Sequence, residues 1–138
     1  MKAPTNLSHK PILTVEDYDF IDGKYVENTD AKALSIGLAQ WDVADLSGKV
    51  WRHSGNKWSR QSEELPLHRI LDLSILTIAS FIEDPESDFA LTNLGEKIIN
   101  KENFHHLSDY LLANEKRIKP RVEEIKRIST LFLEKLKK

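Results

Sequence analysis

Cysteine is absent from this chain, which excludes disulfides, thiolate metal sites and the small secreted scaffolds that disulfides stabilise. Long hydrophobic runs are also missing. The most apolar segment, around residues 70–82, contains Asp72, Ser74 and Thr77 and is too short to cross a bilayer. The N-terminal residues MKAPTNLSHKPIL lack the unbroken apolar core of a signal peptide. We therefore expect a cytoplasmic protein with no membrane partner.

Motifs of established chemistry are missing as well. The chain has no P-loop, no nucleophile elbow and no dinucleotide fingerprint. There is no HExxH pair, and His105 and His106 are neighbours that should point apart on a helix, so we expect no metal and no cofactor. The acidic run at residues 17–22 does not fit a calcium loop, because its glycine comes one residue late and Asn28 occupies the twelfth position. The sequence leaves open whether the protein is an enzyme.

Composition is that of an ordinary globular protein. Apolar residues make up 40% of the 138 residues and charged residues 30%, which argues against disorder. A chain of this length buries about two thirds of the surface that its unfolded form exposes. We therefore expect a single globular domain over residues 1–138.

Charge is distributed unevenly along the chain. Residues 101–138 contain ten Lys or Arg against six Asp or Glu, a net +4, which leaves −6 for residues 1–100. The acidic and basic residues of the tail are interspersed, as on a solvated helix face. Because no zinc finger or aromatic RNA-binding strand accompanies the charge, a nucleic-acid partner is not expected.

The first third of the chain contains turn signals and short apolar runs. Residues 14–27 fit either a short helix or a first hairpin around Asp22–Gly23. Thr29 or Asp30 can cap a helix running to about Trp41. Gly37 would lie in the middle of that helix, where we expect it to let another element approach closely.

A tryptophan-bearing β-hairpin is predicted at about residues 49–61. Gly55–Asn56 suits a type II′ turn that pairs Ser54 with Lys57 and His53 with Trp58. Side chains then alternate between the two faces of the ribbon. One face holds four candidate site residues: Trp51, His53, Trp58 and Arg60.

A central buried helix is predicted at about residues 63–82. Ser62 can cap it, and the apolar side chains that follow cover nearly every direction around its axis. Further helices are expected at 94–100, at 103–114 and from Lys119–Pro120 onward, the last one amphipathic. The predicted fold class is therefore α+β, predominantly α, with the hairpin beside the central helix and several surrounding helices.

The predicted hairpin and the first turns of the predicted central helix bring together the side chains that are best suited to bind a ligand. A pocket between them would have flat indole walls and a few polar groups able to hold an anion. The candidate ligand-binding residues are Trp51, His53, Trp58, Arg60, Glu63, Glu64, His68, Arg69 and Asp72. The alternative is purely structural: Arg60 stacks on Trp51, the glutamates satisfy the helix end, and His68 pairs with Asp72.

The runs TDAKALSIGLAQWD and KWSRQSEELPLHRILDL resemble those of an uncharacterised family of small bacterial proteins, a domain of unknown function, over much of residues 9–82. The resemblance implies a bacterial, cytoplasmic origin, and it supplies no activity, substrate or fold for this chain.

Two functions remain open at this point. The first is a non-enzymatic binding or regulatory protein that forms a homodimer through its amphipathic C-terminal helix. The alternative is a binder of a small anionic or phosphorylated molecule, or an enzyme acting on one, that uses the pocket between hairpin and helix.

Overall fold

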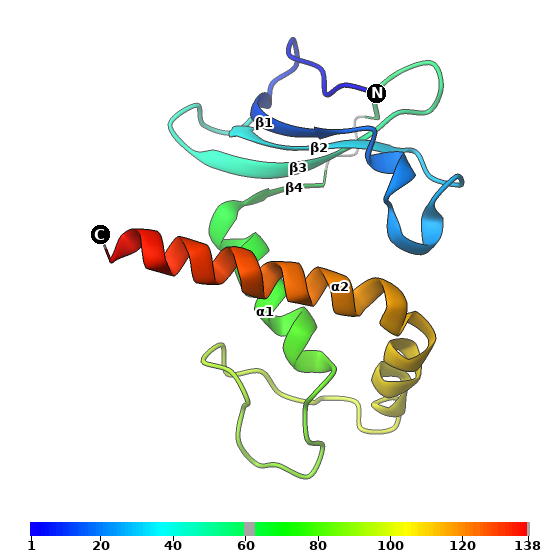
Figure 1. Cartoon of the computed structure of the whole chain (residues 1–138), viewed down its shortest axis with the longest axis vertical. Coiled ribbons are helices and arrows are strands. Elements are labelled where there is room, and N and C mark those ends of the chain that lie inside the picture. Colours follow the sequence, from blue (N-terminus) through cyan, green and yellow to red (C-terminus); the bar gives the residue numbers. More distant parts are fainter. Residues whose placement is uncertain (60–62, 138) are drawn as a thin grey trace. The chain divides into compact units, whose positions relative to one another are not determined.

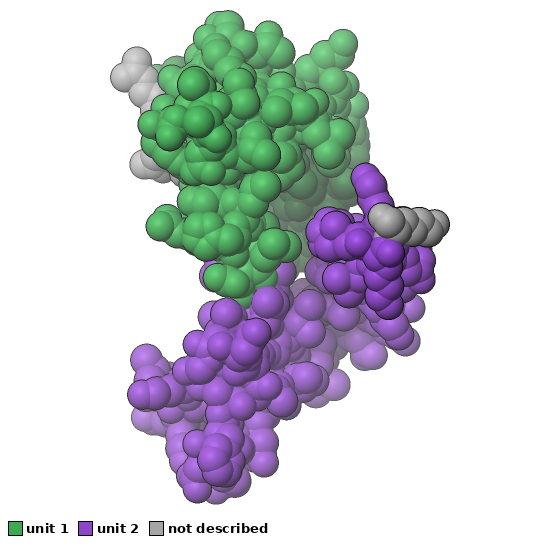
Figure 2. All heavy atoms as spheres, turned by 90° about the vertical axis from the view of Figure 1, so that its left-hand side faces the viewer, with its two compact units in different colours: residues 1–72 green, residues 73–138 purple. Residues whose placement is uncertain are grey.

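The computed structural model describes residues 1–59 and 63–137, which form two compact units, Met1–Asp72 and Leu73–Lys138 (Figures 1 and 2). The first unit contains a four-stranded sheet and the beginning of a helix. The second unit contains the rest of that helix, a long loop and a second, longer helix. Because a compact unit need not fold alone, the expected single domain stays a prediction.

The sheet of the first unit is an antiparallel meander. Its strands are β1 (Lys10–Glu16), β2 (Ala31–Leu38), β3 (Leu46–Arg52) and β4 (Glu63–Pro66), and their spatial order is β1-β2-β3-β4 (Figure 1). Two short 3₁₀ turns, η1 (Tyr18–Phe20) and η2 (Gly23–Tyr25), lie between β1 and β2. Each strand therefore pairs with its neighbour in the chain.

The predicted helix from residue 30 to Trp41 is wrong, because this segment forms β2. Every second residue of AKALSIGL is small and buried, namely Ala31, Ala33, Ser35 and Gly37. That alternation is the period of a strand. The expected close approach at Gly37 is confirmed in its new setting: a Cβ atom there would lie 2.0 Å from the Lys10 carbonyl oxygen on β1.

One face of the sheet carries the core of the first unit. Ala33 is opposite Trp51, and Lys49 is opposite Glu64, so these side chains share a face. Ala3, Ala33 and Trp51 are buried together, and Trp58 packs against them. The core therefore lies between the sheet and the N-terminal segment that contains Ala3.

The opposite face receives the first turns of α1 (Leu67–Ser80). A Cβ atom at Gly48 would lie 2.4 Å from Ile70 Cδ1. The helix begins at Leu67 rather than at residue 63, because residues 63–66 continue the sheet as β4. It is not a buried central helix: Ala79 is its buried residue, whereas Leu71 and Leu73 are 64% and 50% exposed.

The tip of the predicted hairpin is confirmed. His53 pairs with Trp58, and Ser54 N donates to the Lys57 carbonyl oxygen at 3.0 Å. Gly55 has a φ of 100°, in the positive region that the turn was predicted to need. Residues 60–62, which include the predicted site residue Arg60 and the predicted cap Ser62, lie outside the described residues.

The second unit contains α2 (His105–Leu136), a 32-residue helix with Pro120 inside it. Two helices were predicted here, with a break at Pro120. The proline removes the N–H that would bind the Lys116 carbonyl oxygen, but Arg121 Nη1 donates to the next carbonyl, that of Arg117, at 2.8 Å. Residues 94–100 form the end of a turn and irregular chain instead of the predicted helix.

The fold is therefore α+β, with two α-helices and one antiparallel sheet over the described residues. The prediction of a predominantly α protein with several surrounding helices is wrong, because the segment read as an early helix is a strand and two later helices are one. Neither of the two described helices is both long enough and apolar enough to traverse a lipid bilayer.

Candidate functional site

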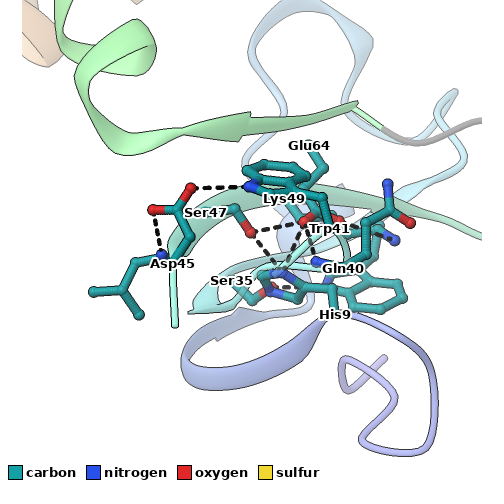
Figure 3. A network of polar contacts seen from close by, with 10 residues as sticks. His9, Ser35, Gln40, Trp41, Asp45, Ser47, Lys49 and Glu64 are labelled. Carbon is teal, nitrogen blue, oxygen red and sulfur yellow. Dashed lines mark hydrogen bonds and ion pairs between the residues drawn. The ribbon is translucent and has the colours of Figure 1, made fainter. Parts of the chain in front are cut away.

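A buried histidine bridges two strands of the sheet through two serines (Figure 3). His9 lies just before β1, and its side chain is fully buried. Its Nδ1 atom is 2.9 Å from Ser47 Oγ on β3, and its Nε2 atom is 2.9 Å from Ser35 Oγ on β2. The imidazole thus connects the N-terminal segment to the middle of the sheet.

The network continues at both ends. Trp51 Nε1 donates to Ser35 Oγ at 2.8 Å, and Ser47 Oγ donates to Glu64 Oε2 at 2.8 Å. The same carboxylate oxygen accepts a bond of 3.0 Å from the backbone nitrogen of Gln40. Side chains from β2, β3, β4 and the N-terminal segment are therefore connected in one polar chain within the first unit.

The hydrogen-bond donors and acceptors of this network determine which atoms of His9, Ser35 and Ser47 carry the hydrogens. The indole N–H can only donate, so Ser35 Oγ accepts it and passes its own hydrogen to His9 Nε2. Ser47 gives its hydrogen to Glu64, so its oxygen accepts the hydrogen of His9 Nδ1. A neutral His9 protonated on Nδ1 satisfies both ring nitrogens, both serine hydroxyls and the Trp51 N–H. A proton on Nε2 would leave the Ser35 hydroxyl hydrogen without an acceptor in the network.

The electrostatics of the site agree with a neutral His9. Burial lowers the pKa of His9 from its ordinary 6.5, and the nearby Lys49 lowers it further, while Glu64 acts in the opposite direction. Desolvation is the largest of these effects. The imidazole is therefore held uncharged beside a carboxylate 3.6 Å from its Nδ1 atom.

Lys49 lies at the end of the network beside the Glu64 carboxylate. Its Nζ atom lies 4.0 Å from Glu64 Oε1 and 4.0 Å from the centre of the Trp51 ring. Burial lowers the pKa of Lys49, and the Glu64 carboxylate partly offsets that effect. Glu64 Oε1 is buried and accepts no hydrogen bond from the described residues, so Lys49 is its charge partner.

A serine, a histidine and a glutamate in series are also the components of a nucleophilic triad. The reacting hydroxyl of a triad must reach a substrate. Here Ser35 is 4% exposed and Ser47 is fully buried, and each hydroxyl is already engaged on both sides. The network therefore fixes the strands and the Glu64 carboxylate rather than presenting a nucleophile.

A hollow of about 740 Å³ lies next to this network within the first unit. It opens at the first turn of α1 and along the loop between β2 and β3. Its lining consists of Trp41, Ala44, Asp45, Leu46, Glu64, Pro66, Leu67, His68 and Arg69. The lining thus combines one indole and four smaller apolar residues with two bases and two acids.

The loop between β2 and β3 holds the indole wall in place. Trp41 Nε1 donates to Asp45 Oδ2 at 2.9 Å, and the backbone nitrogen of Leu46 donates to Asp45 Oδ1 at 2.9 Å. These bonds, the one from Trp41 first, lower the pKa of Asp45, and the nearby His68 contributes in the same direction. An ionised Asp45 therefore orients the Trp41 ring beside the hollow.

The structure separates the predicted site residues into groups. Trp51, His53 and Trp58 contact one another through their rings, with centroids 5.7 Å apart for the two indoles and 4.9 Å for His53 and Trp58. This cluster packs on the core and not on α1. Glu64, His68 and Arg69 line the hollow together.

The remaining predicted residues lie elsewhere. Glu63 forms an ion pair with Arg52, which also binds Asp30. Asp72 is exposed on α1, and within the described part of the chain no ion pair joins it to His68 or Arg69. Because no ligand is present, the binding roles assigned to these residues from sequence stay predictions.

Three residues that sequence reasoning missed are central here: His9, Ser35 and Trp41. His9 and Ser35 are 26 positions apart, and His9 and Ser47 are 38 apart, so no local spacing relates them. Trp41 was read as the end of a helix. The segment Trp41–Asp42–Val43–Ala44–Asp45 offered one usable signal, an acid four residues after an indole.

Among the described residues of the second unit, one group of side chains could hold a metal ion. His105, His106 and Asp109 each offer a ligand atom, and these atoms lie within 4.8 Å of one another. The two imidazoles do not point apart as expected, because their ring centres are 4.2 Å apart. All three residues are exposed, so the group is a surface cluster at the start of α2.

Comparison with known proteins adds a family but no activity. No curated protein and no solved structure matches the chain significantly. Residues 1–91, about two thirds of the chain, match a family model, and they include the buried network and the whole lining of the hollow. The chain therefore belongs to a family of unknown function, DUF6530.

Proposed function

We propose that this protein is a non-enzymatic binding protein whose hollow in the first unit takes a small, flat, anionic molecule. The observation that carries the proposal is the hollow itself, about 740 Å³ in volume and lined by Trp41, His68 and Arg69 among others. Sites for small molecules usually have volumes of about 300–1,000 Å³ and combine apolar walls with a few polar groups.

The lining suggests how such a molecule would bind. Trp41 is 46% exposed and offers the face of its ring for stacking. Arg69 and His68 lie in the first turn of α1, where the helix dipole favours a negative charge. Asp45 can accept a hydrogen bond from a hydroxyl or amino group. A planar ring carrying a phosphate and hydroxyl groups fits these requirements.

The same lining supports binding rather than catalysis. It contains no serine, threonine, tyrosine or lysine among its nine described residues. The two serines closest to it in the network are buried and engaged. Asp45 and Glu64 are held by hydrogen bonds within the fold, so the lining provides groups that hold a ligand and no hydroxyl, thiol or amine nucleophile to attack it.

Titration with adenosine and uridine monophosphates, glucose 6-phosphate and inorganic phosphate tests the proposal. A nucleotide should raise the melting temperature and quench tryptophan fluorescence. Arg69→Ala should weaken binding at least about tenfold, because it removes a charged donor to the anion. Trp41→Phe should remove the quenching, whereas Lys57→Ala, on an exposed turn, should change neither signal. Equal responses in Arg69→Ala and wild type, or no response to any of these compounds, would reject the hollow as the site.

We also propose that the protein self-associates through α2. Support comes from the C-terminal half of this helix, where Ile125, Phe132 and Leu136 are 43%, 57% and 66% exposed. Large exposed apolar surfaces on a folded chain usually mark interaction sites. The bacterial origin and the cytoplasmic location stay predictions from the sequence.

A further inference from the structure

The C-terminal half of α2 carries a stripe of exposed apolar side chains. Ile125, Ile128, Phe132, Leu133 and Leu136 are between 43% and 66% exposed. Ile125, Phe132 and Leu136 recur at intervals of seven and four, which places them on one side of the helix. The stripe therefore offers a continuous apolar face to a partner outside the chain's own core.

The charges beside this stripe argue against pairing with the same helix of another copy. With Ile125 and Phe132 at the centre of a helix–helix seam, the flanking positions from 119 to 135 hold four basic residues and no acid: Lys119, Arg121, Lys126 and Lys135. Two such helices would bring cations together in either orientation. Residues 116–137 carry eight basic residues against three acidic, a net charge of +5, so an acidic partner is favoured.

The second unit itself contains a segment with the complementary character. Residues 83–88, EDPESD, hold four acids and no base, and they lie in the long loop between α1 and α2. Phe89, Leu91 and Ile99 of this loop are 84%, 53% and 94% exposed. The loop thus presents acidic side chains beside exposed apolar ones. The C-terminal half of α2 presents basic side chains beside exposed apolar ones.

The acidic loop is also preformed. Glu96 accepts hydrogen bonds from Leu91 N at 2.9 Å and from Thr92 Oγ1 at 2.7 Å, which closes the loop on itself. A hydrogen bond from Glu83 is the largest of several effects that lower the pKa of Glu96 to about 2, and it raises the pKa of Glu83. Glu86 and Asp88 are left exposed. A loop that is already ordered loses less entropy when it binds.

We propose that two copies of this chain associate reciprocally, with the C-terminal half of α2 in one copy lying against the acidic loop of the other, residues 84–99. The inference rests on the proposed self-association and names its contact. Two such contacts related by a twofold axis would satisfy both faces of both copies. Each contact covers exposed apolar side chains with apolar side chains and sets Lys119 and Lys126 near Glu86 and Asp88.

Two charge-reversed variants of the full chain test the contact by sedimentation velocity. The first, Lys119→Glu with Lys126→Glu, places two acids on the helix against the acids of the loop. The second, Glu86→Lys with Asp88→Lys, places two bases in the loop against the bases of the helix. Each alone should dimerise at least about tenfold more weakly than wild type, because like charges meet at the substituted positions of both contacts. Mixed in equal amounts, they should form a one-to-one complex, since the substituted positions of each copy then meet opposite charges on the other.

The mixture separates contact between copies from contact within one chain. If α2 lay on its own loop, mixing would restore nothing, and that result would overturn the proposal. All four positions are exposed, so circular dichroism should show unchanged folding. A control, Lys2→Glu with Lys57→Glu, makes the same change in net charge as the first variant at exposed positions of the first unit and should dimerise like wild type.

The remaining outcomes distinguish this inference from the proposal it rests on. A wild-type dimer that both charge variants leave intact, but that Phe132→Asp dissociates, would keep the self-association and reject the loop as its partner. A wild-type chain that stays monomeric would reject both. A monomer that cosediments with vesicles of acidic phospholipid would assign the basic face to a lipid surface instead.

Discussion

His9 links the stability of the first unit to pH. Its pKa in the folded protein is lowered from 6.5 by burial, whereas the unfolded chain binds a proton at about 6.5. The unfolded state therefore holds more protons as the pH falls below that value. The stability that the neutral imidazole contributes is complete above pH 6.5 and is lost as the pH falls toward the lowered pKa.

The first prediction concerns the His9→Gln variant. Its amide can still donate to one serine and accept from the other, but it does not titrate. We expect it to lose about 1–3 kcal/mol of unfolding free energy at pH 7.5, because the shorter group cannot keep every buried bond. Between pH 5.5 and 7 its stability should vary less than that of wild type. Denaturant unfolding across this range measures both effects.

An exposed histidine supplies the control for this experiment. His105→Gln should keep the pH dependence of wild type, because His105 lies on the surface at the start of α2. If His9→Gln and wild type lost stability with the same slope below pH 6.5, the neutral, buried imidazole would not be the cause.

Single residues also show where prediction from sequence stops. The pairing of His53 with Trp58 followed from turn chemistry, which depends on adjacent residues. The bond between His9 and Ser47 spans 38 positions and exists only once the register of the sheet is set. Glu64, His68 and Arg69 could be grouped because they are close in sequence. The indole beside them is Trp41, which comes from a loop whose position the sequence pattern did not reveal.

At the level of elements, the small residues of β2 account for two findings. They are the reason this strand was predicted as a helix, and they make room for the buried network. Its inward residues are small because His9 and Trp51 occupy the space in front of them. A strand with such residues has no strong alternation of apolar and polar side chains. Ala33, Ile36 and Gly37 also fit helical spacing, so hydrophobicity alone favoured the wrong period. The expectation that Gly37 lets another element approach closely was correct. It depends on the missing side chain of glycine, which leaves the same space in a strand as in a helix.

The second prediction concerns Gly37→Ala. The new Cβ atom would lie 2.0 Å from the Lys10 carbonyl oxygen and 2.7 Å from Pro11 Cα, both of them backbone atoms. Strand β1 would have to move away from β2, carrying the adjacent His9 with it. We expect a loss of about 1–3 kcal/mol in unfolding free energy and a weaker pH dependence below 6.5. Equilibrium denaturation at pH 6 and 7.5 measures both.

Gly48→Ala is the matched comparison on the other face of the sheet. Its Cβ atom would meet the end of the Ile70 side chain at 2.4 Å, which a shorter or rotated side chain relieves. We expect Ile70→Val to recover part of the stability lost in Gly48→Ala and none of that lost in Gly37→Ala. Equal recovery in both backgrounds would contradict the placement of α1 on the face that Gly48 occupies.

The whole molecule combines two units of unequal internal packing. The family match covers all of the first unit and ends in the loop at residue 91, so α2 lies outside it. Among the described residues of the second unit, only Ala79 and Asn114 are buried. Because α1 has apolar residues on nearly every side, we expected the rest of the chain to bury it. The self-association proposed above would cover part of this exposed apolar surface.

The last prediction follows from that deficit. If the second unit completes its core by self-association, the melting temperature of wild type should rise with protein concentration, by about 3–8 °C over a hundredfold range. Phe132→Asp, at a position 57% exposed, should fold but show no such rise. Raising sodium chloride from about 0.05 to 0.5 M should reduce the concentration dependence, since the basic helix and the acidic loop attract each other through screened charges. A concentration dependence that grew with salt would instead indicate a contact held by apolar surface alone, and scanning calorimetry at matched protein concentrations distinguishes the two.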